Sequence, residues 1–70
     1  MADYRRVDIG FQGGGVLDVR VTSDEHEGLR KAVQRGDGWH ELRTQDSEVA
    51  LDLSQVVYVR LDTEEQRVGF

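Results

Sequence analysis

The chain contains no cysteine, no proline and no long hydrophobic run, and the first and last of these absences each exclude a kind of site or protein. Without cysteine it forms no disulfides and no thiolate metal sites. No apolar segment reaches the roughly 20 residues of a membrane-spanning helix. Residues 1–6 lack the apolar stretch of a secretory signal peptide. We therefore expect a cytoplasmic protein that does not associate with membranes.

The length and the charge limit the remaining classes. The 70 residues are expected to form one small domain, spanning residues 1–70. A domain of this size buries only about 60% of the surface of its unfolded chain, so it needs a well-packed core, self-association or both. The net charge of −5 opposes binding to nucleic acid on average.

Two segments with alternating apolar and polar residues surround a glycine turn near the N-terminus. Alternation with a period of two is typical of half-buried strands, and glycines between two such strands predict a β-hairpin. The strands are expected over residues 4–12 and 16–22, joined by Gly13-Gly14-Gly15. Their inward side chains are Val7, Ile9 and Phe11 in the first strand and Leu17, Val19 and Val21 in the second.

One helix is expected to follow this hairpin. Thr22 and Glu25 have the spacing of a capping box. In such a box the Thr22 side chain accepts a hydrogen bond from a backbone amide of the first helical turn, and the Glu25 side chain reaches back to the Thr22 amide. Gly36 suits the left-handed position just after a helix end. Leu29, Ala32 and Val33 form a narrow apolar stripe. The helix is therefore short and is expected to pack against the sheet.

The second half of the chain predicts strands only, over residues 39–44, 48–53, 56–61 and 67–70. Short strands with short connections favour antiparallel pairing. The expected order is β-β-α-β-β-β-β. The sequence thus predicts an α+β, mainly β domain, built as a curved antiparallel sheet or small open barrel with one helix after the second strand.

The segment 56–61 is apolar on both of its predicted sides. Val57, Val59 and Leu61 lie on one side, and Val56 and Tyr58 lie on the other. A strand of this kind is usually covered on both sides, and one short helix cannot cover both faces of such a sheet. We therefore predict a non-enzymatic interaction module that self-associates as a homo-oligomer and can also contact another protein. Its candidate interface residues are Val56, Tyr58, Trp39 and Phe70.

Two alternative functions remain open at this point. An aromatic and basic surface of Arg20, Arg43, Arg60 and Trp39 would suit a small barrel that binds single-stranded nucleic acid. If Trp39 is exposed, the acidic charge of the chain favours contact with a protein instead, since tryptophan and arginine are enriched at such interfaces. A small-ligand sensor, with its site in a barrel mouth or at a subunit junction, is the second alternative.

No catalytic, cofactor or metal site is predicted. Gly13-Gly14-Gly15 leads into a strand rather than a helix, and no Lys-Ser/Thr pair follows, so a hairpin turn is favoured over a phosphate loop. The histidines, His26 and His40, are each followed by glutamate, but their spacing matches no metal-ligand motif. The serines lie at predicted caps and turns, where they serve backbone hydrogen bonding.

Segments 38–42, 51–60 and 67–70 resemble short uncharacterised proteins of actinobacterial type. The resemblance covers most of the chain, implies a bacterial source and implies no activity. The stretch Val57-Tyr58-Val59-Arg60 is similar to the second motif of Sm-like RNA-binding barrels. This sequence departs from that family because Leu61 replaces the expected glycine, and because its helix follows a hairpin instead of preceding the strands.

Overall fold

A computed structural model describes residues 3–62 and shows five strands, one α-helix and one 3-10 turn. The strands form two antiparallel sheets, one of three strands in the order β2-β1-β5 and one of two strands, β3-β4. The predicted mainly β fold with its helix after the second strand is confirmed, and the sheets do not close into a barrel. The predicted strand 67–70 lies outside the described residues. In chain order, the elements are β1 (Arg5–Phe11), β2 (Val16–Val21), α1 (Ser23–Arg35), β3 (Trp39–Arg43), β4 (Glu48–Asp52), η1 (Leu53–Gln55) and β5 (Val56–Leu61).

The β1–β2 hairpin has the predicted glycine turn. The turn closes with a hydrogen bond from the Phe11 amide to the Gly15 carbonyl at 2.9 Å and one from the Gly14 amide to the Phe11 carbonyl at 3.0 Å. Gly13 and Gly14 have φ angles of 89° and 97°. Glycine adopts this region without the steric cost that a side chain would bring, so the turn depends on these residues.

The start of α1 confirms one half of the predicted capping box, while the other half is wrong. The Thr22 side chain accepts a hydrogen bond from the Glu25 amide at 3.3 Å. The Glu25 carboxylate does not reach back to Thr22; it accepts from the Arg43 amide at 3.1 Å. Among the described strands β3 pairs only with β4, which leaves the other edge of β3 without a strand partner. Glu25 therefore joins the first turn of the helix to that edge.

Two glycines, one inside α1 and one at its C-terminal cap, are expected to respond to alanine substitution with opposite changes in stability. Gly36 has a φ of 77°, where a side chain is strained, so Gly36→Ala is expected to lower the free energy of unfolding by about 1 kcal/mol. Gly28 lies inside the helix, and a Cβ built there meets no atom within 4 Å. Gly28→Ala is therefore expected to raise the same quantity by up to about 1 kcal/mol. Urea unfolding of both variants checks this, and shifts of equal sign would contradict it.

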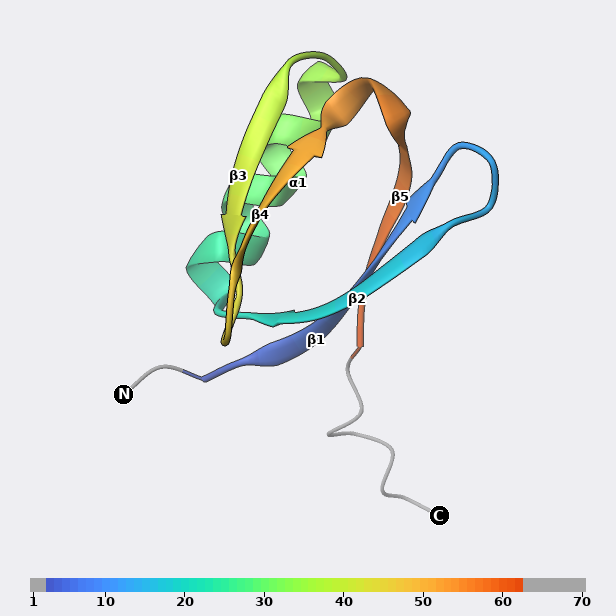
Figure 1. The fold of residues 1–70 in the computed structure, drawn as a ribbon. Coiled ribbons are helices and arrows are strands. Elements are labelled where there is room, and N and C mark those ends of the chain that lie inside the picture. The colour runs from blue at the N-terminus through green and yellow to red at the C-terminus, as the bar shows by residue number, and fades with distance from the viewer. Residues whose placement is uncertain (1–2, 63–70) are drawn as a thin grey trace.

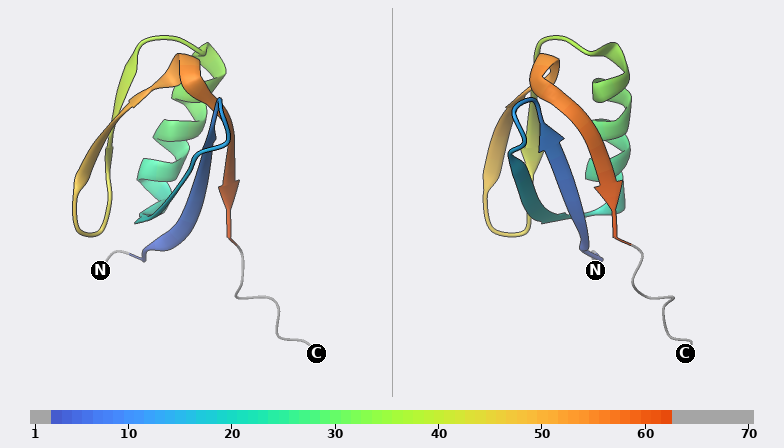
Figure 2. Two further views of the ribbon diagram at one scale, coloured as in Figure 1. Left: turned by 45° about the vertical axis from the view of Figure 1, so that its right-hand side comes forward. Right: turned by 90° about the vertical axis from the view of Figure 1, so that its right-hand side faces the viewer.

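The core lies where the helix, the β3–β4 hairpin and the three-stranded sheet meet. In Figure 1 the helix lies behind the hairpin, and in the right-hand view of Figure 2 the three-stranded sheet lies in front of both. The helix and the hairpin thus both pack on the inner face of that sheet. The predicted apolar stripe is confirmed, since Leu29 and Ala32 are buried and Val33 packs on the core. The central cluster consists of Val7, Ile9, Val21, Leu29, Leu42 and Leu51.

A β-bulge in β5 corrects the predicted division of its side chains. Phe11 pairs with Val56 while Gly10 pairs with Tyr58, so Val57 is an extra residue between two pairs. Across an extra residue the alternation shifts by one position. Val56 therefore packs on the core together with Val59 and Leu61. Val57 was predicted to share their side, but its side chain is exposed.

Candidate interaction surfaces

The outer face of the three-stranded sheet, called here the sheet face, is uncovered by any other described element (Figure 2, right). One end of it holds a network of ion pairs. Arg60 donates to Asp8 at 3.0 Å, while Arg6 lies 3.2 Å from Asp18 and 3.8 Å from Asp62. The network crosses all three strands, and its central carboxylate, Asp8, is buried. With Arg20, the sheet face carries as many cationic as anionic side chains: Arg6, Arg20 and Arg60 against Asp8, Asp18 and Asp62.

The other end of the sheet face is apolar. Val16 in β2 and Val57 in β5 are 58% and 59% exposed, and Tyr58 is 45% exposed. Between these strands lies Gly10 of β1, directly opposite Tyr58. A Cβ built on Gly10 would overlap the Tyr58 ring, so the ring lies on the glycine backbone. This contact gives Tyr58 a fixed place on an otherwise open surface.

The second candidate surface is the outer face of the β3–β4 hairpin, called here the hairpin face. The pairing places Trp39 opposite Asp52, Glu41 opposite Ala50, and Arg43 opposite Glu48. Trp39 is 69% exposed, the largest exposed fraction among the large hydrophobic side chains of residues 3–62. The alternate side chains, His40 and Leu42, point away from this face. The exposure of Trp39 therefore follows from the hairpin register.

Arg43 on the hairpin face is neutralised by its neighbours. Its guanidinium donates to the Glu48 carboxylate at 2.7 Å and 3.2 Å. This side-chain hydrogen bond, together with the charge of Glu48, raises the pKa of Arg43 above its usual range. The pair is largely exposed and contributes little to folding. Its consequence is that Glu41 and Asp52 remain as the net charges beside Trp39.

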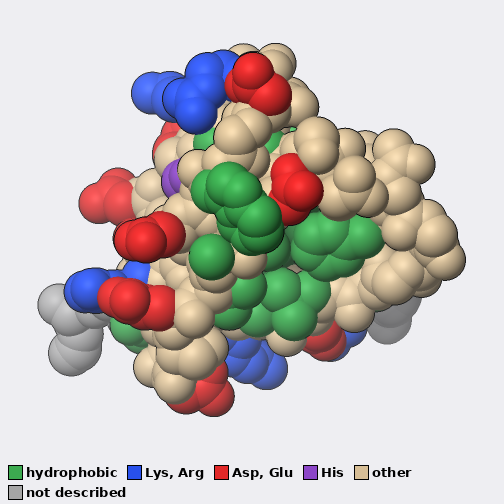
Figure 3. Space-filling model, turned by 45° about the horizontal axis from the view of Figure 1, so that its top comes forward, with side chains coloured by type: hydrophobic (Ala, Val, Ile, Leu, Met, Phe, Trp, Pro, Cys, Tyr) green, Lys and Arg blue, Asp and Glu red, His purple; other side chains and the backbone are tan. Residues whose placement is uncertain are grey.

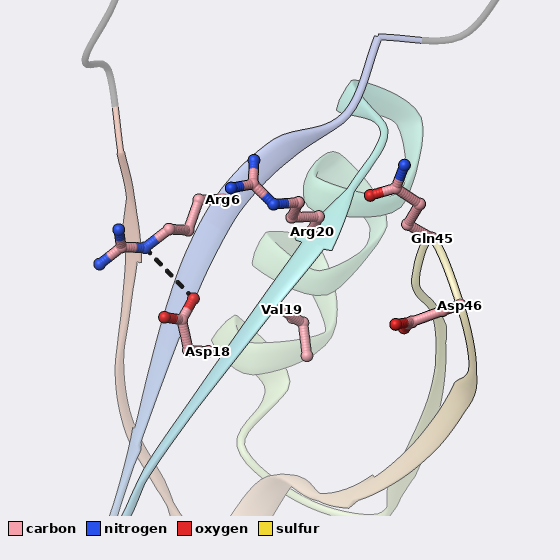
Figure 4. Close-up of a pocket in the computed structure, with 6 residues that line it drawn as sticks. All are labelled: Arg6, Asp18, Val19, Arg20, Gln45 and Asp46. Atoms are coloured by element: carbon pink, nitrogen blue, oxygen red, sulfur yellow. Dashed lines mark ion pairs between the residues drawn. The ribbon is translucent and has the colours of Figure 1, made fainter.

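A polar hollow of about 360 Å³ lies between β2 and the turn of the β3–β4 hairpin (Figure 4). Four charged side chains line it together with Val19 and Gln45, and the Gln45 amide donates to the Arg20 carbonyl at 2.9 Å. Small-molecule sites are mostly apolar with a few polar groups. This hollow has the reverse character, so it gives no support to a small-ligand sensor. The charged residues are Arg6, Asp18, Arg20 and Asp46.

The structure divides the residues that the sequence predicted as one interface. Tyr58 lies on the sheet face and Trp39 on the hairpin face, with both side chains exposed. Val56 was predicted to lie beside Tyr58 on an outer surface, but the bulge turns it to the core. Phe70 lies outside the described residues. The two exposed members of the predicted interface therefore lie on separate surfaces.

The residues predicted to bind nucleic acid are divided in the same way. Arg20 and Arg60 lie on the sheet face on either side of β1, while Arg43 and Trp39 lie on the hairpin face. Arg43 and Arg60 both pair with carboxylates, Glu48 and Asp8. A continuous basic stripe that would follow a phosphate backbone is not formed by these four side chains.

The two histidines are not brought together with carboxylates into a metal site. Within residues 3–62 no group of three or more His, Cys, Asp or Glu side chains is arranged to hold a metal ion. His26 lies on α1, and His40 lies in β3 with its Nε2 buried and without a hydrogen-bond partner.

No helix of the described segment is both long and apolar enough to pass through a bilayer.

Comparisons of the chain with protein-family models, with curated proteins and with solved structures give no match. The sheet face and the hairpin face are therefore the features from which a function can be inferred.

Two residues that help define these surfaces, Gly10 and Asp8, could not be identified from the sequence. In the sequence, Gly10 is one glycine within a predicted strand. Its contact with the Tyr58 ring arises only because β5 pairs with β1. Asp8 shows the outward position in the alternation, but its burial depends on Arg6 and Arg60 from the same face. β1 and β5 are far apart in the sequence but adjacent in the sheet, and no local sequence pattern indicates this strand order.

Proposed function

We propose that this protein is a non-enzymatic interaction module that self-associates through antiparallel pairing of β5 with β5 of a second copy. The observation that carries the proposal is the position of β5, which pairs with β1 on one side and with no described strand on the other. Unpaired edge strands present backbone amides and carbonyls that another strand can bind. The exposed Val57 and Tyr58 beside this edge add apolar contact area.

The hydrogen bonds of the sheet define which groups of β5 face the free edge. The Asp62 amide donates to the Arg6 carbonyl at 2.9 Å, just beyond the pair of Val7 with Leu61. In an antiparallel ladder successive residues point their backbone groups to opposite sides. Tyr58 and Arg60 therefore share the direction of Asp62 toward β1. Val59 and Leu61 direct their amides and carbonyls to the free edge.

A two-fold axis at Val59 makes this edge self-complementary. Val59 then pairs with Val59 of the second copy. On the sheet face this register places Tyr58 opposite Arg60 of the second copy, where a guanidinium on an aromatic ring is favourable. The balanced charges of the sheet face also allow two copies to lie side by side. A two-fold pair uses the same patch on both chains, as most homodimers do.

The proposal is tested by the mass in solution at high micromolar concentration. Light scattering is expected to give twice the chain mass of 8.0 kDa for the natural sequence. Val59→Pro removes an amide that points to the free edge while leaving the pairing with β1, because proline is tolerated where the N–H faces outward. We expect this variant to be monomeric, with an unchanged far-ultraviolet circular dichroism spectrum.

Asp18→Pro is the matched control on the opposite edge of the sheet. The Arg20 carbonyl accepts from Gln45, outside the pairing with β1, so Asp18 also points its backbone away from β1. Asp18→Pro is expected to keep the dimer mass. A mass of one chain for the natural sequence, a dimeric Val59→Pro variant, or equal loss of mass in both variants would each refute pairing through β5.

A further inference from the structure

We infer that the hairpin face is a docking site for a cationic segment of another protein, with Trp39 as the residue on which a cationic side chain stacks. The hairpin face belongs to β3 and β4, whereas the proposed self-contact belongs to β5. The inference therefore goes beyond self-association and does not depend on it.

The indole of Trp39 is available for contact because of its neighbours in the hairpin. Across the strands it faces Asp52, and its diagonal neighbour on β4 is Ala50, whose methyl group covers little of a ring. The resulting exposed fraction is 69%. Tryptophan is among the residues most enriched at binding hot spots, where a large side chain fills a contact at small entropic cost.

The charges beside Trp39 are negative and uncompensated. Glu41 lies two residues further along the same face and forms no ion pair with any residue in the range 3–62. The Asp52 carboxylate accepts from the Ser54 amide at 3.1 Å and from its hydroxyl at 2.7 Å, which holds it in place without neutralising it. In Figure 3, hydrophobic side chains gather in the middle of the view, with both acidic and basic side chains around them.

The acidic character continues along the edge of β3. A hollow of about 170 Å³ is lined by three glutamates, one arginine and Leu42. Glu41 lines this hollow and also follows Trp39 on the hairpin face, so the two features are continuous. A partner segment with two or more cationic side chains would have one on the indole and another at the hollow. The glutamates are Glu25, Glu41 and Glu48, and the arginine is Arg43.

This charge pattern selects one occupant. Phosphates of a nucleic acid would be repelled by Glu41 and Asp52. A second copy docked by the same face would bring like carboxylates together, on chains that each carry a net charge of −5. An arginine or lysine side chain instead gains both the face of the indole and the flanking carboxylates. Arginine suits the site better, because its planar guanidinium stacks on aromatic rings.

The experiment uses the fluorescence of Trp39, which is the only tryptophan of the chain. Titration of the full chain with a hexa-arginine peptide at low salt is expected to change the emission in a saturable way, and a hexa-glutamate peptide is expected to leave it unchanged. Added salt is expected to weaken the binding, since the contacts are exposed. With a dye-labelled hexa-arginine peptide, Trp39→Ala is expected to bind at least about tenfold more weakly by fluorescence anisotropy.

A pair of charge-matched variants separates the site from general attraction. Glu41→Gln and Glu27→Gln each remove one negative charge, but Glu27 lies on the exposed side of α1. Glu41→Gln is expected to weaken hexa-arginine binding by about two- to fivefold, and Glu27→Gln is expected to leave it unchanged. Asp52 is not used for this purpose, because its side chain caps η1.

Several outcomes would overturn the inference. These are binding of hexa-arginine that Trp39→Ala does not weaken, equal weakening by both glutamate variants, and tighter binding of a single-stranded oligothymidine than of hexa-arginine. A loss of dimer mass in Trp39→Ala would show that the hairpin face contacts a second copy. Retained hexa-arginine binding by the Val59→Pro variant is expected, since the docking site does not need the β5 edge.

Discussion

Leu42→Ala is expected to lower the free energy of unfolding by about 2–5 kcal/mol, the range for truncation of a buried leucine. Leu42 is 0% exposed in the central cluster, at the point where β3 packs on the helix. A domain of this size rarely has more than about 3–5 kcal/mol of stability from its core. The variant is therefore expected to be largely unfolded at 25 °C. Circular dichroism across a urea titration measures the change.

Trp39→Ala serves as the control in the same strand. It removes a larger side chain than Leu42→Ala, but Trp39 is 69% exposed on the hairpin face. Its expected effect on the free energy of unfolding is within about 0.5 kcal/mol. If the tryptophan variant were the less stable of the two, the assignment of Trp39 to the surface and of Leu42 to the core would be wrong.

Gly10→Ala is expected to lower the free energy of unfolding by about 1–3 kcal/mol, as overpacking of a tight contact does. The new methyl group would occupy the space of the Tyr58 ring, which would have to leave the β1 backbone. Gly10 has no positive φ, so its backbone geometry alone does not demand glycine. The cost comes from the ring on the neighbouring strand, and thermal unfolding of the variant checks it.

A double-mutant cycle isolates this contact from other effects of the substitution. In a Tyr58→Ala background the added methyl group meets no ring, and Gly10→Ala is then expected to be neutral or to stabilise by up to about 1 kcal/mol, since glycine weakens strands. An equal loss of stability in both backgrounds would refute the packing of Tyr58 on Gly10.

The local elements could be predicted from the sequence because their causes are local. Alternation of apolar residues predicted the strands, and the glycine run predicted the first turn. Thr22 and Gly36 marked the two ends of the helix, and both have the expected cap geometry. These signals act between residues a few positions apart, where sequence spacing and spatial distance agree.

The candidate surfaces could be predicted only in part. Trp39 and Tyr58 were predicted as interface residues, and both are exposed. The side chains of β5 were wrongly divided, because an extra residue opposite Phe11 shifts the alternation at Val57. A bulge depends on the partner strand, and the sequence of β5 alone contains no signal for it.

By itself, the sequence determined the kinds of element, their order, the helix ends and the surplus of apolar side chains, because periodicity and capping are properties of neighbouring residues. The position of β5 beside β1, the contact of Tyr58 with Gly10, and the separation of Trp39 and Tyr58 onto different surfaces follow from the folded arrangement alone. The physical reason is that strand order, register and the bulge arise from contacts between segments far apart in the sequence, as in the pair of Asp8 with Arg60, which are 52 residues apart. Such contacts produce no periodic pattern in the sequence of either segment.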